Sequence, residues 1–310
     1  MLGKNKSLEM LLMFDLFLNE ILKTSSDKNT KSFKEQSQHI HSYIDKLDDK
    51  DIEHILKQIG IIPECIQASS SAEKLFSKSS DVVLARAFKM LGLESNVIAE
   101  RADNADVIAQ STIYGYKLVA DAKCFRLSRT AKNQKDFKVD ALNKWRGENE
   151  FAVLVSPYFQ YPRTNSQIYA TALSTNVCIM SWEHILVLLE NNIRETKDFS
   201  LQSIWNSSKI FAIKTAVANA KECFLLKVNK IIAEKSNISN DEFLQKLEQY
   251  KGIIVQRGDY EIAFCNERIN NIKQLTREQA ITELIKETKL KEKISVIKSF
   301  ISSLEVGANE

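Results

Sequence analysis

Hydrophobic side chains recur at helical spacing through the first ninety residues. This spacing predicts helices rather than strands, because apolar residues three or four apart share one face of a helix. Hydroxyl residues at 69–71 offer N-caps for the last run, which is either one long helix or two helices joined near Ser79. The helices predicted here cover residues 8–22, 37–47, 51–59 and 69–91.

The hydrophobic period changes in the middle of the chain. Residues 105–109 and 116–123 are rich in Val, Ile and Tyr and partly alternate, which is typical of strands. The runs 152–156 and 177–181 are almost entirely apolar, as expected for central strands with both faces buried. The helices predicted between and after these two runs cover residues 136–146 and 182–193.

The last third of the chain has a helical pattern throughout. Asn240, Asp241 and Thr276 are suitable N-caps, for helices that run to Tyr250 and to about Lys289. The sequence therefore predicts an α/β protein with a small mixed sheet embedded in many helices. We expect one domain over 1–310, with a helical region at 1–68, the sheet core at 69–200 and a second helical region at 201–310.

The amino-acid composition narrows the class of protein. The chain is 44% hydrophobic and 27% charged, an ordinary soluble composition, and its 8 Gly and 3 Pro argue against a turn-rich β-sandwich. The five cysteines stand singly, without zinc-site spacing, and indicate reduced thiols of a cytoplasmic protein. The apolar run at 8–22 is too short and too charged to span a bilayer, so we expect no membrane partner.

Candidate chemistry is concentrated on the two strands predicted at 105–109 and 116–123. Asp121 and Lys123 are two residues apart, so on a strand their side chains point to the same face. Asp106 opens the preceding strand, and a hairpin of the two strands would bring it beside Asp121. Two carboxylates and one ammonium group would then converge.

This set of side chains suits phosphodiester hydrolysis with Mg²⁺. Carboxylate oxygens are ligands that Mg²⁺ prefers, and the ion keeps positions open for water and for a phosphate oxygen. The ion stabilises the charge that develops on the phosphate and acidifies the attacking water. Lys123 either orients that water or binds the phosphate, and whether it also removes a proton stays open.

Each of these residues also has a simpler structural explanation. An Asp-x-Lys motif on a strand is most often a solvated pair on an exposed face. Glu73, on the helix before the sheet, is a further candidate metal ligand, but an acidic residue in a first turn more often complements the helix dipole. The four histidines show no ligand spacing, and the sequence has no Gly-rich phosphate loop.

A basic stretch begins at the candidate site. Residues 121–146 include eight basic and three acidic side chains, a net charge of +5 that exceeds the +3 of the whole chain. Basic residues interleaved with Ser, Thr, Asn and Gln suit a surface that contacts DNA phosphates and base edges, although a solvated helix face is the alternative. The residues expected to contact DNA are Arg126, Ser128, Arg129, Thr130, Lys132, Asn133, Gln134 and Lys135.

Several segments of the sequence resemble the HindIII family of type II restriction endonucleases. The likeness is carried by Val119–Lys123 and by the run Phe125–Val139, and it extends over essentially the whole chain. Further segments that carry it are Glu73–Lys78, Phe159–Pro162, Ser181–His184 and Thr276–Ala280. The resemblance implies a PD-(D/E)xK nuclease core in which Asp106, Asp121 and Lys123 are the motif residues; Ala105 stands where that motif has proline.

The resemblance also implies a substrate and partners. These are double-stranded DNA, Mg²⁺ and a second copy in a homodimer, with cleavage of the palindrome AAGCTT after the first A to leave 5′ overhangs. A cognate DNA methyltransferase is expected as the functional partner that protects the host's own sites. Two alternatives remain open from the sequence: a repair or junction-resolving nuclease on the same core, and a non-catalytic DNA-binding relative.

Overall fold

The computed structural model describes most of the chain. The described residues are 2–27, 32–98, 105–129, 134–162, 166–212, 220–288 and 293–298. Backbone contacts divide the chain into two compact units, Met1–Gly258 and Asp259–Glu310. The sheet and the candidate site belong to the first unit. The single predicted domain, with internal boundaries at residues 68 and 200, stays a prediction.

A five-stranded mixed sheet forms the core of the first unit, which confirms the predicted α/β class. Its strands follow one another in space as they do along the chain, from β1 to β5. β1, β2 and β3 pair antiparallel, and β4 and β5 continue the sheet in parallel with β3. The strands are β1 (Glu94–Val97), β2 (Val107–Gln110), β3 (Lys117–Ala122), β4 (Phe151–Ser156) and β5 (Val177–Ser181).

The turn between β2 and β3 fixes the register of this hairpin. The hydroxyl of Ser111 accepts hydrogen bonds from the backbone N–H groups of Ile113 and Tyr114. Gly115 has a φ of +75°, a conformation that residues with a side chain rarely adopt. One side-chain acceptor and one glycine therefore close the turn that sets β2 against β3.

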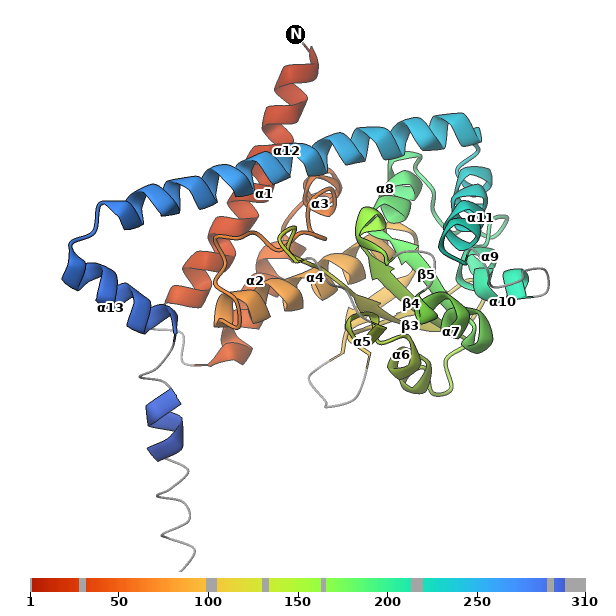
Figure 1. Ribbon diagram of the computed structural model, residues 1–310. Coiled ribbons are helices and arrows are strands. Elements are labelled where there is room, and N and C mark those ends of the chain that lie inside the picture. Colours follow the sequence, from red (N-terminus) through yellow and green to blue (C-terminus); the bar gives the residue numbers. More distant parts are fainter. Residues whose placement is uncertain are drawn as a thin grey trace, which may run out of the picture. The chain divides into compact units, whose positions relative to one another are not determined.

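Helices of the first unit, such as α4, α6 and α8, pack against the sheet (Figure 1). α4 packs on β1, β2 and β3, and it is one continuous helix, which decides between the two alternatives at Ser79. The hydroxyl of Ser79 donates to the carbonyl of Leu75 inside the helix. The helices are α1 (Leu2–Ser26), α2 (Phe33–Asp45), α3 (Asp49–Leu56), α4 (Ser71–Met90), α5 (Gln134–Phe137), α6 (Val139–Trp145), α7 (Gln167–Thr175), α8 (Trp182–Glu190), α9 (Gln202–Trp205), α10 (Ser207–Ala212), α11 (Ala220–Lys235), α12 (Asn240–Lys273) and α13 (Arg277–Glu287), with a 3₁₀ turn, η1 (Tyr158–Gln160).

Some elements differ from the sequence prediction. The edge strand β1 and the helix α7 are additional, and the four residues of β1 include too few apolar side chains to signal a strand. The helix predicted over 136–146 is two helices, α5 and α6, because Lys138 between them has a left-handed φ of +48°. The helix predicted to end at Tyr250 continues through Gly252 to Lys273.

The second unit contains the C-terminal end of α12 and all of α13. Thr276 caps α13 through a capping box with Gln279, as the sequence predicts. Several large apolar side chains of this unit are exposed: Ile262, Ile269, Ile272, Ile281 and Leu284. Despite this exposure, none of the helices in the described part of the chain is both long and apolar enough to cross a membrane.

A buried carboxylate links the start of α8 to the segment that follows β4. The Glu183 carboxylate accepts a hydrogen bond of 2.9 Å from the backbone N–H of Tyr158. Burial raises the pKa of Glu183 to about 7, although this hydrogen bond acts in the opposite direction. The folded protein therefore holds a proton on Glu183 at pH values where the unfolded chain has released it.

We expect Glu183→Gln to stabilise the protein at about pH 8 and to have little effect at about pH 4. The folded-state pKa lies above the unfolded one, so the contribution of Glu183 to the free energy of unfolding is complete at low pH and is lost as the pH rises through about 7. Gln keeps the acceptor for Tyr158 without the ionisation, so its advantage should approach roughly 3 kcal/mol.

Urea unfolding of both proteins across this pH range measures the difference. Glu234→Gln is the control, because Glu234 is exposed on α11. Parallel pH profiles for the wild type and Glu183→Gln would contradict the prediction.

Candidate functional site

The hairpin of β2 and β3 brings Asp106 and Asp121 together. Val107 pairs with Ala120 in the antiparallel register, and continuing that register by one residue sets Asp106 opposite Asp121. The carbonyl of Asp106 accepts a hydrogen bond of 2.8 Å from the N–H of Ile98, which extends the pairing of β1 with β2. The two carboxylates therefore lie side by side at one end of the hairpin.

Lys123 lies one residue beyond β3 and is held through both of its backbone groups. Its N–H donates to the carbonyl of Val155 on β4 at 2.8 Å. Its carbonyl accepts from the indole N–H of Trp182 on α8 at 3.0 Å. The ammonium group forms an ion pair with the Asp121 carboxylate. The fixed backbone thus directs the lysine side chain at Asp121.

Trp182 reaches Lys123 because residue 60 is a glycine. A Cβ atom on Gly60 would lie 2.8 Å from Cδ1 of Trp182 and 2.8 Å from Cγ of Pro157, closer than van der Waals contact permits. The carbonyl of Gly60 also accepts from the N–H of Phe125, two residues after Lys123. Close packing at Gly60 therefore supports the backbone that presents Lys123.

Asp106, Asp121 and Lys123 open onto one pocket of about 620 Å³. Besides Glu73, α4 contributes three charged groups that the sequence analysis does not single out: Lys74, Lys78 and Asp81. Their signal in the sequence is weak, because α4 carries other charged residues as well, among them Arg86 and Lys89, and nothing in the run marks which of them face the sheet. The residues that line the pocket are Phe33, Ile62, Glu73, Lys74, Ser77, Lys78, Asp81, Asp106, Asp121, Ala122, Lys123, Cys124 and Arg129.

Two carboxyl groups of the pocket, those of Asp81 and Asp121, are buried. Burial raises the pKa of Asp121; the Lys123 ammonium opposes this shift and the neighbouring Asp106 adds to it. Burial likewise raises the pKa of Asp81 well above its usual value, with a further contribution from Asp106. A cation that enters the pocket is favoured, because it offsets the cost of ionising these acids.

The donor atoms of the pocket fit Mg²⁺. Asp106 and Asp121 offer hard carboxylate oxygens, and Mg²⁺ is commonly bound by one or two carboxylates while water fills its other positions. Within the described residues, no three Asp, Glu, His or Cys side chains come close enough to form a metal-binding group by themselves. A pair of carboxylates facing an open pocket suits an ion that keeps several waters.

Two comparisons with known proteins identify the family. The family model described as the HindIII restriction endonuclease matches residues 15–301. The chain is also 42% identical over 288 residues to the type II restriction enzyme HindIII of Haemophilus influenzae. The aligned residues make up 93% of this chain and 96% of that protein. The chain belongs to the HindIII family of type II restriction endonucleases. It is therefore a nuclease, and the alternatives of a repair enzyme and of a non-catalytic relative gain no support.

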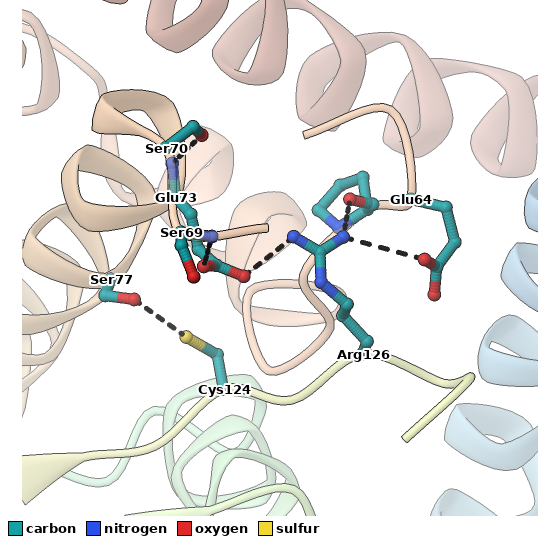
Figure 2. A network of polar contacts seen from close by, with 8 residues as sticks. Glu64, Ser69, Ser70, Glu73, Ser77, Cys124 and Arg126 are labelled. Atoms are coloured by element: carbon teal, nitrogen blue, oxygen red, sulfur yellow. Dashed lines mark hydrogen bonds and ion pairs between the residues drawn. The ribbon is translucent and has the colours of Figure 1, made fainter. Parts of the chain in front are cut away.

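In this HindIII-family enzyme, Glu73 and Arg126 form an ion pair at the edge of the pocket. Nη2 of Arg126 donates to Oε1 of Glu73 at 2.7 Å, and Nη1 donates to the carbonyl of Pro63. Figure 2 shows the guanidinium between the carboxylates of Glu73 and Glu64. The other carboxylate oxygen of Glu73 accepts from the backbone N–H of Ser69 at 2.6 Å. This geometry favours a structural role for Glu73 over metal binding.

The side chain of Arg126 is likewise held by contacts within the protein. Its side chain is 14% exposed and bridges the segment before α4 to the segment after β3. These contacts favour an anchoring role, in which Arg126 fixes the start of the basic stretch. A direct contact of Arg126 with DNA would require this bridge to open.

Among the described residues of the expected DNA contact, Arg129 is the one that lines the pocket. Its side chain is exposed, and its Cζ atom lies 5.5 Å from the centre of the Phe125 ring. Its Nη2 atom forms an ion pair with Oδ1 of Asp136 at 2.5 Å. Its place at the mouth of the pocket suits a phosphate contact next to the scissile group.

The remaining residues of the expected DNA contact are partly described. Ser128 and Lys135 are exposed, and the backbone of Gln134 begins α5. The residues that lie outside the described part of the chain are Thr130, Lys132 and Asn133. Their contact with DNA stays a prediction.

We expect Trp182→Phe to lower the rate of DNA cleavage about tenfold and to leave the DNA affinity in Ca²⁺ unchanged. The substitution removes the hydrogen bond from the indole N–H to the carbonyl of Lys123 and keeps an aromatic ring in the core. Single-turnover cleavage measures the rate. Trp205→Phe is a matched control, since Trp205 donates its indole N–H to Tyr116 in the core and not to the pocket. Equal rates for the two folded variants would refute the prediction.

Proposed function

We propose that this protein is a Mg²⁺-dependent endonuclease that cuts double-stranded DNA at AAGCTT after the first A, leaving 5′ overhangs. The observation that carries the chemistry is the convergence of Asp106, Asp121 and Lys123 on one pocket. The proposed target sequence is supported by the identity of 42% to the type II restriction enzyme HindIII.

Asp106 and Asp121 would hold Mg²⁺, and Lys123 would act on the water or the phosphate. When bound, Mg²⁺ supplies charge stabilisation at the phosphate oxygens and a lower pKa for the attacking water. Lys123, fixed by its backbone and by Asp121, orients the water or holds the phosphate as a cation. Water adds to the phosphorus atom, the P–O3′ bond breaks, and the 3′ oxygen leaves as a hydroxyl. The product ends are a 3′ hydroxyl and a 5′ phosphate.

A palindromic target calls for a protein with two-fold symmetry. We infer a homodimer in which each subunit cuts one strand, because one asymmetric site cannot meet both strands in the same way. The exposed apolar side chains on α12 and α13 give the chain a surface of the kind that associates with another protein. A cognate DNA methyltransferase in the same cytoplasm would complete the system by protecting host sites.

Asp121→Asn and Lys123→Ala are expected to lower DNA cleavage on the order of a thousandfold or more, because each removes a group that contacts the metal ion or the reacting atoms. DNA binding in Ca²⁺ should remain measurable. Removal of Mg²⁺ with a chelator should abolish cleavage by the wild type in the same assay. Asp198→Asn and Lys197→Ala are controls, since both residues are exposed and outside the pocket. Full activity of either site variant would exclude the assignment.

Digestion of long duplex DNA with Mg²⁺, followed by sequencing of the ends, tests the proposed target. We expect discrete fragments whose strands begin with 5′-AGCTT and carry four-nucleotide 5′-AGCT overhangs, because the cuts are placed symmetrically on the two strands. Fragments with another constant end sequence would keep the nuclease assignment and refute AAGCTT.

A further inference from the structure

Lys78 and Asp81 form an ion pair on the face of α4 that lines the pocket. Nζ of Lys78 lies 3.2 Å from Oδ1 of Asp106 and 3.6 Å from Oδ2 of Asp81. The side chains of Lys78 and Asp81 are 17% and 7% exposed. Lys78 therefore bridges a carboxylate on the helix and a carboxylate on the sheet.

The placement of Asp106 explains what this bridge does. Asp106 stands just before β2, and its side chain is 39% exposed, against 2% for Asp121. An exposed side chain at the end of a strand has several rotamers available, whereas a metal ligand has to hold one of them. Lys78 supplies the contact that selects a rotamer, from a helix that packs on β1, β2 and β3.

Asp81 in turn depends on Lys78. An ionised carboxylate this deeply buried is costly without a counter-ion, and Lys78 is its ion-pair partner. The ammonium group of Lys78 lies within ion-pair distance of the carboxylates of both Asp81 and Asp106. Lys78 is thus a fixed positive charge between two acids.

We propose that Lys78 is a positioning residue of the nuclease site, which fixes the carboxylate of Asp106 for Mg²⁺ and is itself held in place by Asp81. The inference rests on the proposed function, since it requires Asp106 to bind the metal ion. Lys78 acts through Asp106, whereas Lys123 acts on the water or the phosphate. α4 thereby contributes to the site as a helix that sets the geometry of a strand residue.

The test compares Lys78→Met and Lys78→Arg with Lys89→Met, a control in the last turn of the same helix and outside the pocket. Lys78→Met is expected to weaken Mg²⁺ binding to the DNA-free protein on the order of tenfold, measured by calorimetry. Its kcat should fall by a similar factor, with KM for DNA unchanged. Lys78→Arg should keep most of the Mg²⁺ affinity and most of the kcat, because a guanidinium can also bridge two carboxylates.

The direction in which the Mg²⁺ affinity changes distinguishes a positioning role of Lys78 from electrostatic repulsion between Lys78 and Mg²⁺. Loss of a positive charge near the metal site would by itself strengthen Mg²⁺ binding. Weaker binding is therefore specific to the loss of a fixed Asp106. Unchanged or tighter binding in Lys78→Met overturns the proposal, and so does a raised KM for DNA with normal Mg²⁺ binding, which would make Lys78 a phosphate contact.

A double variant separates positioning from stability. Lys78→Met leaves Asp81 buried without its partner, so the added change Asp81→Asn should restore thermal stability but not Mg²⁺ affinity. Recovery of both would mean that Lys78 acts only through the fold, and would overturn the proposal. Asp106→Asn distinguishes the two failures. If it cuts DNA at the wild-type rate, the metal-site assignment within the proposed function fails, whereas an inactive Asp106→Asn beside a wild-type-like Lys78→Met refutes only this inference.

Discussion

The buried carboxylate of Asp121 is the constraint on which the rest of this structure depends. Its side chain is 2% exposed, and an ionised group withdrawn from water is stable only where cations or hydrogen-bond donors compensate it. Lys123 provides this compensation from two residues further along the chain. The backbone at Lys123 has to stay in place for the pair to persist, and β4 and the indole of Trp182 hold it there.

The same requirement accounts for the arrangement of the elements around β3. An antiparallel partner on one side delivers Asp106, and a parallel partner on the other side holds the backbone of Lys123. A helix packed on the hairpin delivers Lys78 and Asp81. Strands and helices hold side chains in place more firmly than long loops do, and the geometry of a metal ligand depends on that firmness.

Sequence patterns predict those site residues whose positions depend on a single strand or on a hairpin of two neighbouring strands. Asp121 and Lys123 follow from the two-residue period of a strand, and Asp106 follows from a hairpin between adjacent strands. Asp81 could not be predicted in this way, because nothing in a helical run shows which of its faces will meet the hairpin. Arg126 has the charge expected of a DNA contact, yet the tertiary position of Glu73 gives it an internal partner. Local sequence patterns therefore identify candidate site residues, but the contacts of each side chain depend on how distant segments pack together.

Five of the charged groups that line the pocket form one connected series, in the order Lys123, Asp121, Asp106, Lys78 and Asp81. A divalent cation held by Asp106 and Asp121 would add positive charge to this series, and the negative charge of a phosphodiester would offset part of it. Each of the two charges makes the site more favourable for the other. Binding of the metal ion and of the DNA backbone is therefore coupled by charge, and the coupling acts equally in both directions.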